Sequence, residues 1–86
     1  MTQGERLPTE KELKEEDRRI RHLRRMVDFT VMLIIGSPGM SVEEASGHVA
    51  ALKEFAMRLF PGKEHVFDMV YGPRLRRILN DKFRMS

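Results

Sequence analysis

The sequence predicts an all-α protein in which a long helical hairpin is closed by two short helices. Three observations predict this class. Apolar residues recur at helical spacing in four segments, Gly and Pro separate these segments, and no two segments resemble a pair of strands. In chain order, the expected helices cover residues 10–36, 41–60, 63–71 and 73–83, with boundaries good to a few residues.

The first predicted helix has a charged front and an apolar rear. Thr9 and Glu12 have the spacing of a capping box, which marks a helix start. Between residues 10 and 19 the only large apolar side chain is Leu13, so we expect this part to fray or protrude. An apolar stripe then follows at intervals of three and four: Ile20, Leu23, Val27, Val31 and Ile34.

Residues 29–35 could also form a strand, because Phe, Thr, Val and Ile favour extended backbone. A lone strand leaves its backbone groups unpaired, and nothing else in the chain looks like its partner. The helix is therefore favoured for this segment.

Glycine, proline and capping residues separate the remaining helices. Gly36 can take a left-handed C-cap conformation and Pro38 cannot continue a helix, so the first helix ends there. Ser41 and Glu44 form a second capping box. The third helix should end at Gly72, with Pro73 opening the fourth. The inward residues of these two short helices are expected to be Val66, Phe67, Val70, Leu75, Ile78, Leu79 and Phe83.

Length and composition limit the classes of protein that fit. The 86 residues suit one domain, which we place at residues 9–86 behind a disordered lead of residues 1–8. Absence of Cys excludes disulfides, thiolate zinc sites and thiol nucleophiles, and fits a reducing compartment. The N-terminus lacks the apolar segment of a secretory signal, and no apolar run reaches the ~18 residues of a membrane span. A cytoplasmic protein without membrane contact is expected.

Residues suited to catalysis or metal binding are few. His48 and His65 each have one acidic neighbour at helical spacing, Glu44 and Asp68, but two ligands are too few for a metal site. No G-x-S-x-G motif is present. Asp28, in an apolar stretch, is expected to pair with a neighbouring arginine. We therefore expect no catalytic residue, metal, cofactor or small-molecule substrate, and a non-enzymatic protein.

Arginine clusters give the chain a second candidate function. Net charge is only +3, yet residues 18–25 hold five arginines and no acid, while residues 10–17 hold five acids against two bases. Arginine forks suit phosphate oxygens. Nucleic-acid binding is therefore the alternative, and its candidate contacts are Arg18, Arg21, Arg25, Arg74, Arg76 and Arg77.

The first helix has apolar residues on more than one face, and the chain contains seven methionines, which suit adaptable contacts. Three short partner helices should not cover all of this surface. We therefore expect a helical protein-interaction or self-association module, a homo-oligomer or the partner of another protein. Its candidate contact residues are Met26, Phe29, Met32, Leu33 and Ile35.

The last third of the chain resembles small bacterial helical proteins of unknown function. The resemblance runs from Leu59-Phe-Pro-Gly-Lys-Glu to Tyr71-Gly-Pro-Arg-Leu-Arg-Arg-Ile-Leu. It implies a bacterial source and carries no activity and no residue role.

Overall fold

The computed structural model describes residues 7–84 of the chain and confirms the all-α class, with four helices and no strand in that range. The helices are α1 (Glu10–Ile35), α2 (Val42–Leu59), α3 (Glu64–Val70) and α4 (Gly72–Phe83). Of the predicted disordered lead, residues 1–6 lie outside the described part, and Leu7 and Pro8 precede α1 without helical structure.

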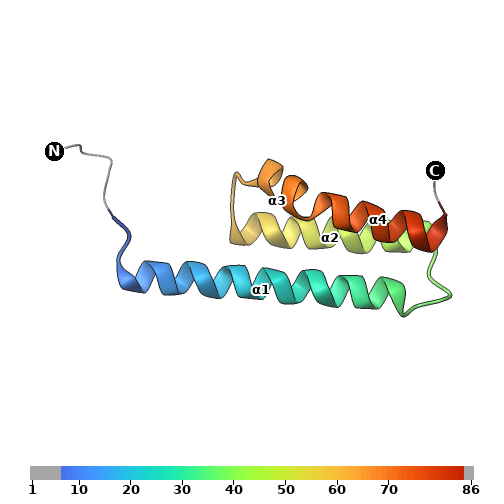
Figure 1. Cartoon of the computed structure of the whole chain (residues 1–86), viewed down its shortest axis with the longest axis horizontal. Helices are drawn as coiled ribbons and strands as arrows, with labels where there is room; N and C mark the ends of the chain where they lie inside the picture. Colours follow the sequence, from blue (N-terminus) through green and yellow to red (C-terminus); the bar gives the residue numbers. More distant parts are fainter. Residues whose placement is uncertain (1–6, 85–86) are drawn as a thin grey trace.

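The two long helices form the predicted hairpin (Figure 1). After the loop at residues 36–41, α2 runs back along α1, and α3 with α4 then folds over α2 so that α4 also contacts α1. Because α1 has 26 residues and α2 has 18, the N-terminal part of α1 extends past the end of the three-helix body. This projecting segment is the charged front that the sequence predicted to protrude.

Side-chain caps fix the starts of the two long helices. The Thr9 hydroxyl accepts a hydrogen bond from the Glu12 amide at 3.1 Å. At α2 the box is reciprocal: the Glu44 amide donates to the Ser41 hydroxyl, and the Ser41 amide donates to the Glu44 carboxylate, both at 3.1 Å. The hydrogen bond from the Ser41 backbone amide is the main cause of a lowered pKa of Glu44, and hydrogen bonding from the Ser41 side chain lowers it further. The sequence predicted a capping box at each of these starts; the structure shows the complete box at Ser41 and the side-chain cap at Thr9.

The junction of the two short helices differs from the prediction. Gly72 was expected to end the third helix, but it is the first residue of α4. Tyr71 alone separates α3 from α4, and its amide hydrogen-bonds the Phe67 carbonyl at 2.9 Å. Pro73 still lies in the first turn of α4, where a helix needs no amide donor.

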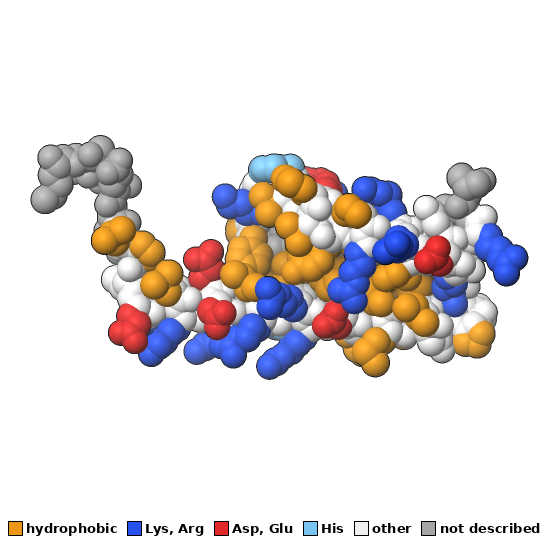
Figure 2. All heavy atoms as spheres, viewed as in Figure 1, with side chains coloured by type: hydrophobic (Ala, Val, Ile, Leu, Met, Phe, Trp, Pro, Cys, Tyr) orange, Lys and Arg blue, Asp and Glu red, His pale blue; other side chains and the backbone are white. Residues whose placement is uncertain are grey.

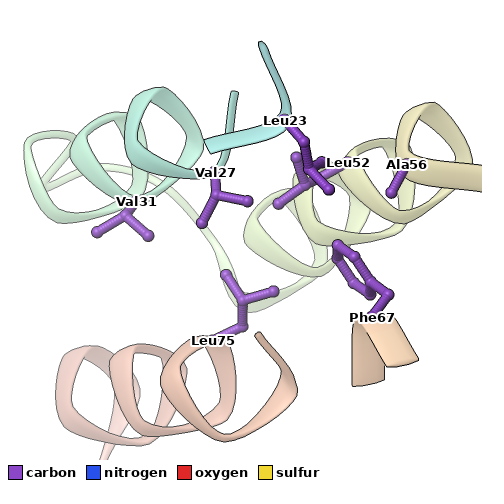
Figure 3. Close-up of a cluster of buried hydrophobic side chains, with 7 residues drawn as sticks. All are labelled: Leu23, Val27, Val31, Leu52, Ala56, Phe67 and Leu75. Atoms are coloured by element: carbon purple, nitrogen blue, oxygen red, sulfur yellow. The ribbon is translucent and has the colours of Figure 1, made fainter. Parts of the chain in front are cut away.

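The core lies where the hairpin meets the two short helices (Figure 3). Side chains from all four helices point toward one another there: Leu23, Val27, Val31, Leu52, Ala56, Phe67 and Leu75. Val27 is fully buried, as the predicted stripe of α1 required. Thr30 is the buried polar residue in the described chain, and its hydroxyl donates to the Met26 carbonyl at 2.8 Å. This hydrogen bond offsets the cost of removing the hydroxyl from water.

The position of α3 depends on Lys53 in α2. Its ammonium lies 3.0 Å from carboxylate oxygens of both Glu64 and Asp68, on successive turns of α3. Hydrogen bonds to Glu64 and then to Asp68 raise the pKa of Lys53. Since α3 has only seven residues and no side-chain cap at its start, this contact and the buried ring of Phe67 hold it against α2.

Candidate association surface

An apolar groove of about 420 Å³ lies where α1 leaves the three-helix body, between α1, the end of α2 and the start of the α3–α4 pair. Residues from each of these elements line it: Glu16, Ile20, Leu23, Arg24, Ala56, Met57, Phe60, Lys63, Val66, Phe67, Val70 and Tyr71. Figure 2 shows the hydrophobic surface at this level, above the charged, projecting part of α1. The groove is open and a side chain can enter it from outside.

The groove exists because three apolar segments meet without covering one another. Ile20 continues the core stripe of α1 past the end of α2 and is 37% exposed. On the opposite wall, α3 buries Phe67 but leaves Val66 39% and Val70 60% exposed. Both valines were predicted to point inward, and that prediction was wrong, because a seven-residue helix offers only one position to a core that α2 already fills.

Charged side chains border the groove on the α1 side. Glu16 and Arg24 lie two helical turns apart on the same face, before and after Ile20. Within residues 7–84 neither has an ion-pair partner. Arg19, by contrast, is engaged, since its guanidinium carbon lies 5.9 Å from the centre of the Phe60 ring. Within residues 7–84 the groove thus carries one unpaired acid, Glu16, and two unpaired bases, Arg24 and Lys63.

The association residues predicted from the sequence lie elsewhere on α1 and divide into two groups. Met26 and Leu33 are half-buried, and Met26 packs against the core. Phe29, Met32 and Ile35 are 60–71% exposed. By helical geometry Phe29 and Met32 point away from Val27 and the core, so they do not contribute to the groove. The groove was not predicted from the sequence.

The candidate nucleic-acid contacts are all exposed, but two of them already form ion pairs within the chain. Arg21 is paired with Asp17 at 2.9 Å, and Arg74 with Asp28 at 3.2 Å. Arg18 and Arg25 share a face of α1, while Arg76 and Arg77 are on α4, where the Arg76 guanidinium lies over Gly72. Arg74 contacts α1 at Asp28, outside the arginine cluster of residues 18–25.

The residues considered for catalysis or metal binding lie mostly on the surface, and Asp28 has a different partner from the one expected. Asp28 is exposed rather than buried, and it pairs with Arg74 of α4 instead of an arginine on its own helix. His48 and His65 are exposed as well. His22 packs its ring edge against Phe55, with centroids 5.0 Å apart. Among residues 7–84, no three His, Asp or Glu side chains are grouped so that they could hold a metal ion.

Comparison of the chain with protein-family models, with curated proteins and with solved structures gave no match. The resemblance of the last third to small bacterial proteins stays a prediction. Of the described helices, none has both the length and the apolar character required to cross a membrane.

Proposed function

We propose that this chain is a non-enzymatic protein-interaction module that binds an apolar helix in the groove between α1, the end of α2 and α3. The observation that carries the proposal is the exposure of Ile20, Val66 and Val70 around one groove rather than singly over the surface. Full burial of one such side chain contributes about 1.5–3 kcal/mol. Helix-in-groove binding places several apolar anchors of the ligand against a surface of this kind.

A photoreactive amino acid at position 70 tests the proposal. With the cross-linker in place of Val70, we expect protein adducts, because this side chain is 60% exposed at the groove wall. The matched control carries the same cross-linker at Met69, which is 68% exposed on the same helix but does not line the groove.

Mass spectrometry identifies the adduct, and binding is then measured with purified components. The identified protein should bind the natural chain and lose affinity for Val70→Glu, but not for Met69→Glu. Equal cross-linking from both positions, or none from position 70, would contradict the proposal.

A second candidate function, nucleic-acid binding, is favoured by one observation. Basic residues recur at intervals of three and four along the side of α1 that faces away from the core: Lys11, Lys14, Arg18, Arg21 and Arg25. All five are exposed, so the stripe could follow a phosphate backbone.

Salt dependence tests this candidate. Replacing Arg18, Arg21 and Arg25 together by Gln should lower the slope of log affinity against log salt by about 0.9 for each phosphate contact removed from duplex DNA. Arg58→Gln, which changes an exposed arginine of α2, is the control. Absence of binding to duplex and single-stranded probes at low salt would exclude the function.

A further inference from the structure

We infer that the ligand of the groove is a second copy of this chain, whose projecting α1 segment packs antiparallel against α1 in a twofold-symmetric dimer. The inference rests on the proposed function and names its partner. The relevant segment is the part of α1 that extends past the three-helix body (Figure 1). Leu13 and Ile20 are seven residues apart and therefore lie on one face of α1, the face that lines the groove, with Glu16 between them. Leu13 is 52% exposed.

Two copies of α1 have complementary charges when they run antiparallel, but not when they run parallel. Residues 10–17 hold five acids and two bases, and residues 18–25 hold five arginines and no acid. Two copies that run antiparallel and cross at the level of Arg18 place each acid-rich segment beside the arginine-rich segment of the other copy. A parallel pair would place acids beside acids and arginines beside arginines, which is repulsive.

The same crossing supplies the groove with its apolar ligand. Residues 10–25 span about 24 Å at a rise of 1.5 Å per residue. With the twofold axis near Arg18, Leu13 of one copy lies beside Leu23 of the other, at the groove. Each chain gives an apolar anchor and receives one, as a twofold-symmetric interface requires.

The axis also gives Glu16 and Arg24 partners in the other copy. In this register Glu16 of one copy lies within one helical turn of Arg24 of the other, and the symmetry repeats the contact. Neither side chain has an ion-pair partner within residues 7–84. In each chain α2, α3 and α4 lie along the C-terminal part of α1, and the N-terminal part of α1 extends past them (Figure 1).

Charge reversal at these two positions tests the dimer. Glu16→Lys alone faces two Lys–Arg contacts in a homodimer, and Arg24→Glu alone faces two Glu–Glu contacts. We expect each single variant to raise the dimer dissociation constant about tenfold or more at low salt, since two attractive contacts become repulsive. An equimolar mixture of the two variants forms a heterodimer with both contacts attractive, and its affinity should return to that of the natural chain.

Sedimentation equilibrium of the full-length chain at micromolar concentrations measures these affinities, with circular dichroism showing that helix content is unchanged. The control pair is Glu15→Lys and Arg25→Glu, which make the same charge changes one position away, off the groove face. Weakening by the single variants with recovery on mixing, and neither effect in the control pair, is the expected result.

Two other outcomes overturn this dimer and leave the proposed function to be decided separately. A natural chain that dimerises but does not respond to reversal at Glu16 and Arg24 associates through another surface. A natural chain that stays monomeric has no second copy in its groove, whereas a cross-link from position 70 to a different protein would still support helix binding.

Discussion

The Arg74 guanidinium lies 3.2 Å from the Asp28 carboxylate, from Nη1 to Oδ1, although the two residues are 46 positions apart. The pair joins α4 to the middle of α1. Both side chains are at least half exposed, so water and salt screen their attraction.

We expect the Asp28–Arg74 pair to contribute little to stability. A double-mutant cycle with Asp28→Asn and Arg74→Gln, measured by urea unfolding, should give a coupling free energy of about 0.2–1 kcal/mol that decreases as salt is added. A coupling of several kcal/mol would mean that α4 is held to α1 by this contact rather than by Leu75 in the core.

Phe67 should be the most sensitive position of α3. Its ring is 5% exposed and is the contribution of α3 to the buried cluster, so Phe67→Ala should lower the free energy of unfolding by about 3–5 kcal/mol. Phe29→Ala removes the same ring from an exposed position on α1 and serves as the matched control. Chemical denaturation that gives equal losses for the two variants would contradict the position of α3.

The capping box of α2 predicts a stability change in acid. Ser41 lowers the pKa of Glu44 in the folded protein, so the contribution of Glu44 is complete above its unfolded-state pKa and is lost as the pH falls through the lowered value. Ser41→Ala should cost about 1 kcal/mol at neutral pH through loss of the hydroxyl cap. It should weaken the acid dependence without abolishing it, because the backbone amide of residue 41 still donates to the Glu44 carboxylate. Thermal unfolding followed by circular dichroism measures both effects.

Glu43→Gln is the control for the capping box, since it removes a carboxylate from the same turn without a hydrogen bond to Ser41. If Glu43→Gln and Glu44→Gln changed the acid dependence equally, the macrodipole of α2 and not the capping box would be its cause.

Lys53 predicts the opposite dependence, in alkali. Its pKa is raised in the folded protein by Glu64 and Asp68, so its contribution is complete below the ordinary lysine pKa and is lost as the pH rises through the raised value. Lys53→Met should lower the melting temperature at neutral pH, and the difference from the natural chain should shrink in alkali. Lys11→Met, on the projecting segment, should show no such convergence.

Local signals in the sequence were sufficient to predict the helices. The caps at Thr9 and Ser41 depend on residues three positions apart, and the buried stripe through Val27 follows from one period, so both are visible in a single segment. The start of α4 was misplaced because Gly72 commonly ends helices, and only the packing of Leu75 onto the core decides that it begins one.

The groove could not be predicted in the same way, because it depends on the relative lengths and directions of helices. Val66 and Val70 have the spacing of buried residues, and their exposure follows from where α3 crosses the end of α2. The partner of Asp28 was missed for a similar reason, since Arg74 reaches it only through the fold. The protruding front of α1 was predicted, and the signal was that Leu13 is the only large apolar side chain between residues 10 and 19.

Only one residue lies between α3 and α4, so we expect the two short helices to move together. Tyr71 ends one helix and begins the next, and its ring is 5.5 Å from that of Phe67. Any helix that presses against Val70 in the groove should therefore also push on the first turn of α4, whose Arg74 contacts Asp28 of α1. We expect occupancy of the groove to be detectable as a displacement at Asp28, on a part of α1 outside the groove.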